Sequence, residues 1–509
     1  MEHKIYTLDR LSPLLRDLKA KGKRIVQCHG VFDLLHLGHI RHFTSAKKHG
    51  DVLVVTLTSD RYVNKGPGRP VFNDKLRAEV IASLADVDYV AINDAPTAVP
   101  AINAICPEVF IKGNEYQKEK DFTGGIDEEA RAVAGNGGIV EFTDDVTFSS
   151  TKLINNFLSP YPEAAQEFLR GLQTRFTSRD IFDYFEKIKK YKVLVIGEAI
   201  IDDYHYVRAM HKSPKETIIA TRYESEEAFP GGVLACANHV AGYCEAVDVV
   251  TFLGKEDSKE EFIRKHLKPN VVPTFFYHPS APTIVKRRFV DPAFLTKMFE
   301  VYHFNDSPIP SDMEEAILRY LERVLPHYDL VIVTDYGHGF LTPRLRECIA
   351  KGASFLALNT QTNSANFGFH VVAKYPRADY VCVDQIEARL AFRHKDVVST
   401  DTWKDIIGEM FGALNAKHAV ITLGHEGCLS YDGENLYKIP VLSTNVLDRV
   451  GAGDAFLAVT SPLVRAGMPG EAVGFIGNAV GALAVTIVGN KEAVEPVSLL
   501  KSINTMLKG

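Results

Sequence analysis

Two histidines near the N-terminus are the first side chains whose type and spacing indicate chemistry. His36 and His39 are separated by Leu-Gly and follow the Gly-Val-Phe-Asp stretch at 30–33. A strand is predicted before this stretch, over 23–28, and a helix after it, over 39–49. The start of a helix favours a bound anion, and imidazoles there can donate hydrogen bonds to phosphate oxygens. The segment therefore predicts a nucleotide-phosphate site, whereas two nearby ligands are too few to favour zinc.

A carboxylate near the C-terminus forms the second informative pattern. Asp454 directly follows Gly451-Ala452-Gly453, and a helix is predicted from Ala455 onward. Glycines allow the backbone to fold around an anion. A carboxylate beside a transferring phosphoryl group can accept the proton of an attacking hydroxyl. The pattern predicts a phosphoryl-transfer site with Asp454 as its base, although Gly-x-Gly-Asp alone is more often a turn.

The elements that must position these residues alternate between strands and helices. In the N-terminal part, apolar runs of strand length occupy 23–28, 51–57, 87–92 and 109–111, with helical patterns between them. Such alternation predicts a parallel sheet with helices on both faces, and therefore an α/β fold.

A second and larger α/β domain is predicted to start at residue 191. Its buried strands are predicted at these positions: 191–197, 246–252, 330–334, 354–358, 380–383 and 419–423. Alternating stretches at 217–223 and 283–290 predict a small accessory sheet. The predicted domains are 1–158 and 191–509, joined by a helical linker over 159–190.

The composition excludes several classes of protein. The 509-residue chain is 46% hydrophobic with a net charge of −6, so a broadly basic nucleic-acid-binding surface is not expected. Its seven cysteines include no C-x-x-C pair, which indicates free thiols in a reducing cytoplasm. The nearly uncharged stretch 472–489 could span a bilayer by length. It contains four glycines, Asn478 and Thr486, so a buried core helix and no membrane span are predicted.

Residues 20–158 resemble the nucleotidyltransferase superfamily that carries an H-x-G-H signature. The likeness rests on His36 to His39 and on further motifs: Lys65-Gly66-Pro67-Gly68-Arg69-Pro70, Arg77, Val87-Asp88-Tyr89-Val90, Ile111-Lys112-Gly113 and Phe148-Ser149-Ser150-Thr151-Lys152. It is close to the glycerol-3-phosphate cytidylyltransferases, and closer to the adenylyltransferase half of the bifunctional heptose enzymes.

This resemblance implies a Rossmann-like domain in which His36 and His39 stabilise the transition state at the α-phosphate. It implies binding of the nucleotide and its phosphates by the following residues: Gly30, Phe32, Asp33, Gly38, Lys65, Lys112, Ser149, Ser150 and Thr151. From the residues alone, Lys65 and Lys112 could equally be solvated surface lysines.

Residues 190–505 resemble the ribokinase-like (PfkB) sugar kinases. The likeness rests on these stretches: Val195–Tyr204, Pro230-Gly231-Gly232 with Asn238, Val333–Gly339, Ile421–Gly427 and Asp448–Phe456. It implies a ribokinase-like α/β sandwich with Asp454 as catalytic base. It implies an anion hole and nucleotide contacts from Gly424, Gly427, Gly451, Ala452 and Gly453, and sugar contacts from Asp202 or Asp203, Gly231, Gly232 and Asn238.

The kinase part departs from the family pattern in three places. Asp384-Gln385-Ile386-Glu387 stands where relatives have Asn-x-x-Glu near a Mg²⁺–phosphate network, and Arg449 stands where many have Thr. The motif that ends in Asn238 is also longer than usual. Asp384 and Glu387 are the predicted Mg²⁺ ligands; the alternative is that they form a solvated helix start.

Together the halves predict a bifunctional enzyme of nucleotide-sugar synthesis. One half would phosphorylate a sugar or a heptose-7-phosphate-like sugar phosphate with ATP. The other would transfer a nucleotidyl group from ATP or CTP to a sugar 1-phosphate and release pyrophosphate. The bifunctional heptose enzymes place the kinase first, so the domain order here is reversed. The alternatives are that only the nucleotidyltransferase half is active, or that the chain is a catalytically silent ligand-binding regulator.

Three further expectations accompany this prediction. By resemblance the protein forms a homodimer, and it is expected in the cytoplasm without nucleic-acid or membrane partners. The basic run Lys286-Arg287-Arg288 could contact a phosphate on the sugar, or it could be a solvated edge strand.

Overall fold

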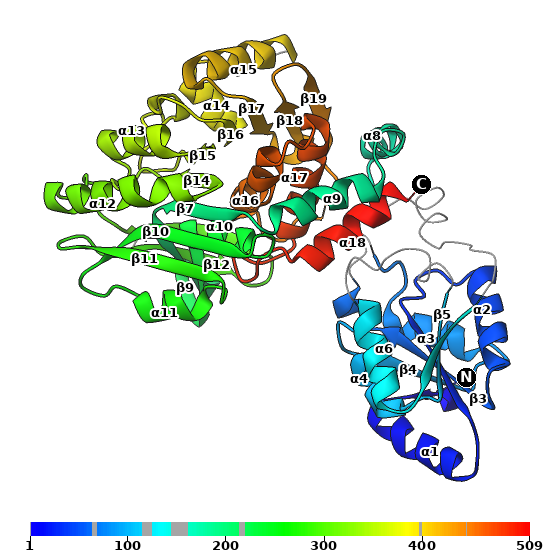
Figure 1. The fold of residues 1–509 in the computed structure, drawn as a ribbon. Coiled ribbons are helices and arrows are strands. Elements are labelled where there is room, and N and C mark those ends of the chain that lie inside the picture. The colour runs from blue at the N-terminus through cyan, green and yellow to red at the C-terminus, as the bar shows by residue number, and fades with distance from the viewer. Residues whose placement is uncertain are drawn as a thin grey trace. The chain divides into compact units, whose positions relative to one another are not determined.

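The computed structural model divides into two compact units, residues 1–160 with 504–509, and residues 161–503. The parts of the chain that it describes are the following: 2–63, 69–113, 125–143, 161–212, 219–395, 400–443 and 445–508. Figure 1 shows the elements of each unit. The predicted α/β class is confirmed in both units.

The first unit is built around a six-stranded sheet in the order β1-β4-β3-β2-β5-β6, in which all described pairs are parallel. Its elements are β1 Ile5–Tyr6, α1 Leu8–Ala20, β2 Ile25–Gly30, α2 Leu37–Lys47, β3 Val52–Thr58, α3 Asp74–Ala82, β4 Tyr89–Asn93, α4 Val99–Ile105, β5 Val109–Gly113, α6 Gly125–Gly135 and β6 Ile139–Thr143.

The sequence of β3 explains why it lies inside this sheet. Every residue of Val52–Thr58 is buried, as expected for a strand covered by helices on both faces. Chain order runs outward from β2 to β3 and β4 on one side, and through β5 and β6 on the other. The direction therefore switches between β2 and β5, and ligands of open α/β sheets bind at the carboxyl ends of the strands at such a point.

The second unit contains a nine-stranded sheet in the order β11-β10-β7-β14-β15-β16-β17-β18-β19 and a four-stranded accessory sheet in the order β13-β12-β8-β9. Its first elements are α8 Glu163–Gln173, α9 Ser178–Ile188, β7 Lys192–Gly197, β8 Ala199–Lys212, β9 Ile219–Gly232, α10 Val233–Val240, β10 Ala246–Gly254, α11 Glu260–His266, β11 Val271–His278, β12 Ile284–Asp291 and β13 Thr296–His303.

The remaining elements supply the rest of the large sheet and its helices. They are α12 Ser311–Val324, β14 Leu330–Asp335, α13 Pro343–Gly352, β15 Leu356–Thr360, β16 Tyr380–Asp384, α14 Gln385–Ala391, α15 Thr400–Leu414, β17 His418–Thr422, β18 Cys428–Tyr431, β19 Leu436–Ile439, α16 Ala452–Arg465 and α17 Gly470–Ala484. The last helix, α18 Pro496–Leu507, begins in this unit, and its residues from 504 onward are grouped with the first unit.

Helices cover both faces of the large sheet. Helices α12, α13, α14 and α15 share one apolar core with strands β7, β14 and β15. Helices α10 and α16 pack against strands of the sheet outside that core, and α17 packs against α16. Eleven of the fifteen residues of α17 are buried, which confirms the core helix predicted within 472–489. Within the described parts of the chain, no helix has the length and apolarity needed to cross a membrane.

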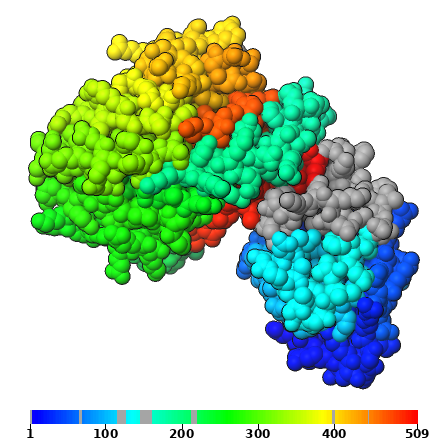
Figure 2. Space-filling model, viewed as in Figure 1, coloured from blue at the N-terminus to red at the C-terminus, as the bar shows by residue number. Residues whose placement is uncertain are grey.

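The predicted accessory sheet is confirmed at β9 and β12, and it also contains β8 and β13, which side-chain alternation alone does not predict. Helices α8 and α9, from the predicted linker, belong to the second unit. An ion pair between Arg175 and Glu471 and a hydrogen bond from Tyr184 to the Gly467 carbonyl attach them to it. Figure 2 shows the surface that these helices form.

Candidate functional site

Five neighbouring parallel strands of the large sheet, β7 and β14 to β17, end at the same edge. The polar and glycine residues that follow these ends are Glu198, Tyr336, Thr362, Glu387 and Gly424. The carboxyl edge of an open α/β sheet is where such folds bind ligands. The candidate kinase site is therefore built at this edge.

Asp454 lies in the first turn of α16, next to this edge. Gly451 precedes the helix with φ of +82°, and a Cβ there would lie 2.0 Å from Oδ1 of Asn490, so the turn requires glycine. Tyr336 donates a hydrogen bond from its hydroxyl to Oδ1 of Asp454 at 2.7 Å. Burial, aided by the negative charge of Asp202, raises the pKa of Asp454 to about 6, although the Tyr336 bond acts in the opposite direction. A carboxylate with such a pKa suits a general base near neutral pH.

Asp202 lies on the inner face of the accessory sheet and is 4% exposed. Its Oδ1 pairs with Arg288 of β12, and its Oδ2 accepts a hydrogen bond from Asn490 Nδ2 at 3.0 Å. A Cβ on Gly231 would lie 2.2 Å from Oδ2 of Asp202, so Gly231 provides the space that this carboxylate occupies. Asn490, which binds Asp202, also packs against Gly451 in the turn before Asp454, so the two carboxylates border one site.

Two predicted sugar contacts lie elsewhere. Asp203 accepts hydrogen bonds from Arg287 at 2.7 Å and from His205 at 3.1 Å, on the opposite face of β8 from Asp202. The side-chain amide of Asn238 in α10 donates a hydrogen bond to the carbonyl of residue 266 and accepts one from the backbone amide of residue 268. The structure therefore brings Asp202 to the candidate base, while Asp203 and Asn238 have partners of their own. Gly232, with φ of +58°, forms the sharp connection from β9 to α10.

Glu198 fixes the loop that follows β14. Its carboxylate is fully buried and accepts hydrogen bonds from the backbone amides of Tyr336 at 3.0 Å and His338 at 3.1 Å. Burial, followed by the charge of Asp335, raises the pKa of Glu198 to about 7. Asp335 itself pairs with Lys374 at 2.7 Å. This network holds Tyr336 in place and therefore orients its hydroxyl toward Asp454.

The inner face of β12 carries two buried cations. Lys286 is 4% exposed and Arg288 is 7% exposed, whereas Arg287 points to the outer face. The Lys286 ammonium lies 5.8 Å from the centroid of the Tyr336 ring, and burial lowers its pKa. His338 is 1% exposed, and neither ring nitrogen has a hydrogen-bond partner among the described residues. The solvated-edge-strand alternative is therefore wrong, because β12 lies between β13 and β8 and Arg287 on its outer face pairs with Asp203. Positive charge lies inside the candidate site.

The predicted Mg²⁺ ligands form a reciprocal cap at the start of α14. Asp384 accepts hydrogen bonds from the amides of Ile386 and Glu387, and Glu387 accepts one from the amide of Asp384 at 2.8 Å and one from Thr362 at 3.0 Å. Both the helix-start alternative and a ligand role are compatible with this geometry, because each carboxylate oxygen has more than one lone pair.

The charges at this cap fit a cation. Burial and then the charge of Asp384 raise the pKa of Glu387 to about 8. Mg²⁺ characteristically binds one or two carboxylates together with substrate phosphates and water. Within the described parts of the chain, no cluster of three or more His, Cys, Asp or Glu side chains could hold a metal by itself. The pair therefore fits a Mg²⁺ ion that completes its shell with nucleotide phosphates.

Gly424 and Gly427 form the turn after β17. Both have positive φ, +61° and +97°, and a Cβ on Gly427 would lie 2.0 Å from the carbonyl oxygen of Ile439. A Cβ on Gly424 would meet nothing within 4 Å, so this glycine faces open space. The turn follows a strand at the same sheet edge as Asp454, and it remains a predicted nucleotide contact. Ala452 and Gly453 are partly buried and exposed, respectively, in the first turn of α16.

In the first unit, His36 and His39 lie together at the start of α2. Their rings are stacked with centroids 4.0 Å apart. His36 caps the helix: its Nδ1 accepts a hydrogen bond from the Gly38 amide at 3.1 Å. Burial lowers the pKa of His36, so a neutral ring with its proton on Nε2 is favoured. The arrangement provides an N–H donor at the helix start beside the switch point of the sheet.

The loop before α2 is fixed by a buried carboxylate. Asp33 is 1% exposed, pairs with Arg69 at 3.0 Å and accepts a hydrogen bond from the Val71 amide at 2.6 Å. Phe32 has φ of +48° and its ring lies edge-on to His39. A Cβ on Gly30 would lie 2.9 Å from the Phe32 ring. These residues support the position of His39, and the structure gives Asp33 a role in holding the loop.

Lys112 lies at the end of β5, across the switch point from β2. It is 8% exposed and pairs with Glu129 of α6 at 2.7 Å. The surface-lysine alternative therefore does not apply to Lys112. Lys65, Ser149, Ser150 and Thr151 lie outside the described residues.

The fold of the second unit and the residues at its sheet edge match one family of proteins. The model of the pfkB family carbohydrate kinases matches residues 190–496, and the chain belongs to this family. The cytidylyltransferase-like family model matches residues 28–156. Both predicted resemblances are confirmed, with the nucleotidyltransferase-like domain first and the kinase domain second.

Curated relatives resemble the first domain. The bifunctional protein HldE of Geobacter metallireducens is 40% identical over 166 residues, which is 31% of this chain and 32% of that protein. HldE of Methylobacillus flagellatus is 40% identical over 153 residues, 30% of each chain. These matches span less than a third of the length of the relatives.

Solved structures resemble the second domain. Phosphofructokinase-2 from Escherichia coli in complex with potassium aligns with a TM-score of 0.52 and 14% identity, over 62% of this chain and 99% of that one. The same enzyme in complex with fructose-6-phosphate aligns with a TM-score of 0.50 and 15% identity, over 61% of this chain and 97% of that one. At such identity the likeness shows the fold alone.

Several residues of the kinase site were not predicted as site residues. Tyr336 and His338 lie within the stretch 333–339, on which the family resemblance rests. Their position directly after a predicted strand indicates that they lie at the edge of the sheet. Asn490 and Lys297 lie in segments without a recognisable motif. Their contacts depend on loops and strands that are distant in sequence from their partners.

Proposed function

We propose that the chain is a bifunctional enzyme of nucleotide-sugar synthesis. Its kinase domain transfers the γ-phosphoryl group of ATP to a hydroxyl of a sugar phosphate, which yields ADP. Its nucleotidyltransferase domain joins a sugar 1-phosphate to the α-phosphate of ATP or CTP and releases pyrophosphate. The observation that carries the proposal is the placement of Asp454, beside Tyr336 and Asp202, at the start of a helix on the carboxyl edge of the sheet.

In the kinase reaction Asp454 accepts the proton of the attacking sugar hydroxyl. The pKa of about 6 keeps most of this carboxylate ionised at neutral pH. The backbone amides that follow Gly451 face an anion at the helix start, where the helix dipole also favours negative charge. When bound, Mg²⁺ would neutralise the charge of the transferring phosphates, with Asp384 and Glu387 as its protein ligands.

The kinase substrate is proposed to carry a phosphate already. Lys286 and Arg288 place two cations on the inner face of the accessory sheet, although Arg288 also pairs with Asp202. His338 offers a buried ring nitrogen that has no partner among the described residues. A phosphate group would supply the missing hydrogen-bond partner and would compensate the buried charge of Lys286. A heptose 7-phosphate satisfies this requirement, as does any sugar phosphate of similar size.

In the transfer reaction His36 and His39 donate hydrogen bonds to the phosphate oxygens on which negative charge increases. Lys112, whose ammonium group pairs with Glu129, lies at the neighbouring strand end of the same edge. The protein performs little covalent chemistry in such a step, because oriented donors stabilise the transition state. The similar HldE proteins are named bifunctional, which supports two activities in one chain. The heptose-type sugar is proposed from the motifs by which the first domain resembles the bifunctional heptose enzymes.

The proposal also includes Mg²⁺ dependence, a homodimer and a location in the cytoplasm. All seven cysteines are free thiols in the structure, which agrees with a reducing compartment. Aromatic and apolar side chains, including Phe299 and Val301, are exposed on the accessory sheet. This exposed surface supports a contact with a second copy of the chain.

Two assays of the full-length protein with Mg²⁺ test the function. One measures pyrophosphate release from ATP and from CTP with a panel of sugar 1-phosphates. The other measures ADP formation with heptose 7-phosphate, other sugar phosphates and the same sugars without phosphate. Activity in both assays is expected. Activity in the first assay alone would show that only the nucleotidyltransferase is active, and no turnover across both panels would favour a ligand-binding regulator.

A further inference from the structure

A buried carboxylate joins the accessory sheet to the loop that precedes α16. Asp448 is 5% exposed, and both of its oxygens are fully used. Oδ1 accepts hydrogen bonds from Lys297 Nζ at 2.5 Å and from the Val450 amide at 3.1 Å. Oδ2 accepts them from the Tyr204 hydroxyl at 2.8 Å and from the Gly489 amide at 2.9 Å. One side chain thus holds two strands of the accessory sheet and two loops of the large domain.

Lys297 supplies the positive charge for this contact. Among the described residues it is the one cation that forms an ion pair with Asp448. Burial would raise the pKa of Asp448, but the hydrogen bonds from Lys297, Gly489 and Val450 outweigh that effect and hold the pKa below its usual value. A buried carboxylate without its cation is strongly unfavourable, so the ion pair and the loop geometry depend on each other.

The two backbone amides that Asp448 binds lie next to residues of the phosphate-binding turn and of the sugar site. Val450 adjoins Gly451, the residue that opens the phosphate-binding turn before Asp454. Gly489 adjoins Asn490, whose amide donates a hydrogen bond to Asp202. The closest approach to a Cβ on Gly451 is also an atom of Asn490. The two loops therefore pack together, and Asp448 fixes both.

We propose that Lys297 is a positioning residue for the kinase reaction. Its ammonium group, carried on β13, holds Asp448 and so orders the turn from Gly451 to Asp454 for the transferring phosphoryl group. Lys297 acts through Asp448 and touches no reacting atom. The inference rests on the proposed kinase function and adds to it the coupling between the accessory sheet and the phosphate-binding turn. A displaced turn lowers the rate of phosphoryl transfer because reacting atoms require close alignment.

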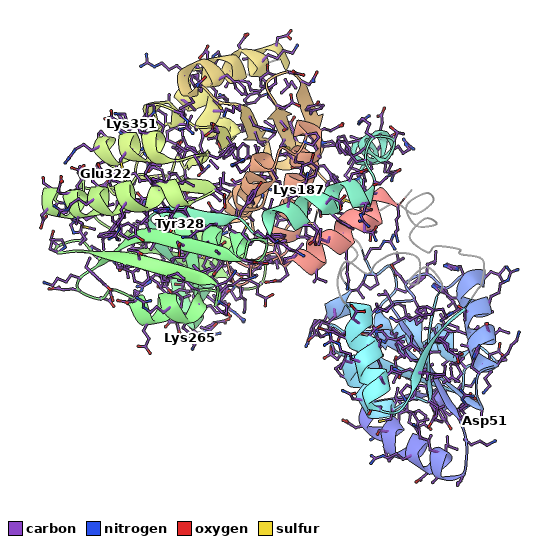
Figure 3. The ribbon with its side chains drawn as sticks, viewed as in Figure 1. Asp51, Lys187, Lys265, Glu322, Tyr328 and Lys351 are labelled. Carbon is purple, nitrogen blue, oxygen red and sulfur yellow. The ribbon has the colours of Figure 1, made fainter. Side chains whose placement is uncertain are left out.

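The test compares Lys297→Ala, Lys297→Arg and a matched control in the full-length protein. Lys265→Ala removes an exposed lysine of α11 in the same domain, and Figure 3 labels that residue. ADP formation is measured over a range of sugar phosphate concentrations. Lys297→Ala is expected to lower kcat roughly 100-fold with a smaller change in KM, because misplacement of reacting groups by about 1 Å has an effect of this size. Lys297→Arg is expected to retain part of the rate, and Lys265→Ala all of it.

Chemical rescue separates the proposed role from a general structural one. The Lys297 side chain is 28% exposed, so a small cation can reach the space that alanine leaves. Methylammonium or ethylammonium is expected to restore part of the kcat of Lys297→Ala, while tetramethylammonium at the same ionic strength is not. Hydrogen exchange is expected to increase in Lys297→Ala at peptides covering 448–456, and to return toward wild type with the small amine.

The outcomes distinguish the inference from the function on which it rests. If wild type forms no ADP with any substrate, the proposed kinase function fails and the inference fails with it. If wild type is active and Lys297→Ala keeps its kcat, the inference alone is overturned. The same holds if Lys297→Ala loses kcat without recovery by small amines and without faster exchange over 448–456. Thermal unfolding of each variant identifies any loss of activity that comes from an unfolded protein.

Discussion

The hydroxyl of Tyr336 donates a 2.7 Å hydrogen bond to Oδ1 of Asp454, and the backbone amide of the same tyrosine is held by the buried carboxylate of Glu198. The candidate base is thus oriented from the end of β14, although it belongs to α16. This contact also affects protonation, because a hydrogen bond to the ionised carboxylate favours the charged form.

The pH dependence of the kinase follows from this relationship. Asp454 must be ionised to accept a proton, and its pKa is about 6. The rate, as kcat/KM, is therefore expected to rise with pH through about 6 and to reach a plateau above it. Tyr336→Phe removes a hydrogen bond that lowers the pKa of Asp454, so this pKa is expected to be higher in the variant. The rise of kcat/KM with pH is therefore expected to occur at a higher pH in Tyr336→Phe than in wild type. Steady-state kinetics between pH 5 and pH 8 measure both profiles. An unchanged limb in Tyr336→Phe would contradict the assignment of Asp454 to that limb.

The two activities are expected to be separable by single substitutions. Asp454→Ala removes the base and is expected to lower ADP formation by about 10²- to 10⁴-fold, with pyrophosphate release unchanged. His39→Ala removes a donor at the α-phosphate and is expected to lower pyrophosphate release by about 10²- to 10³-fold, with ADP formation unchanged. Both variants are assayed for both products. Loss of both activities in either variant, with an unchanged unfolding temperature, would show that the sites are not independent.

The buried strands and the positions of three candidate catalytic residues could be predicted from local patterns. Val52–Thr58 is a continuous apolar run, and such a run predicts a strand covered on both faces. His36, His39 and Asp454 lie at the start of helices after glycine-containing turns, so their placement depends on short-range geometry. These features involve residues close in sequence, and the corresponding predictions of fold class and family are confirmed.

The remaining contacts depend on long-range packing. Asp202 and Asp203 are adjacent and chemically identical. Only the register of β8 against β12 shows that Asp202 lies opposite Lys286 and pairs with Arg288 on that face, while Asp203 lies opposite Arg287. A shift of one residue would exchange their faces. Asn490 reaches Asp202 from 288 residues away, without a motif around it. The choice between the two aspartates therefore depends on strand register, and the position of Asn490 depends on packing that no local pattern indicates.

A glycine on β9 provides a test of the space around Asp202. Gly231→Ala would place a Cβ 2.2 Å from Oδ2 of Asp202, in a site that is closely packed. The carboxylate must move, so the KM for the sugar substrate is expected to rise about 10-fold, and overpacking is expected to cost about 1–3 kcal/mol of stability. Gly408→Ala in α15 is the control, because its Cβ would meet nothing within 4 Å. Kinase kinetics and thermal unfolding measure both effects. A Gly231→Ala protein with the wild-type KM would show that Asp202 does not contact the sugar.

The two faces of β12 test whether the kinase recognises a phosphate on its substrate. Lys286→Met removes a buried cation from the inner face, while Arg287→Met removes a half-buried one, paired with Asp203, from the outer face of the same strand. A lost charge-assisted hydrogen bond is worth about 1.5–3 kcal/mol, so Lys286→Met is expected to raise the KM for a sugar phosphate by roughly 10- to 100-fold. The KM for the same sugar without phosphate is expected to change little, since the lost contact is to the phosphate. Equal effects of Lys286→Met on the phosphorylated and unphosphorylated sugars would place the phosphate elsewhere, and an Arg287→Met variant as defective as Lys286→Met would assign recognition to the outer face.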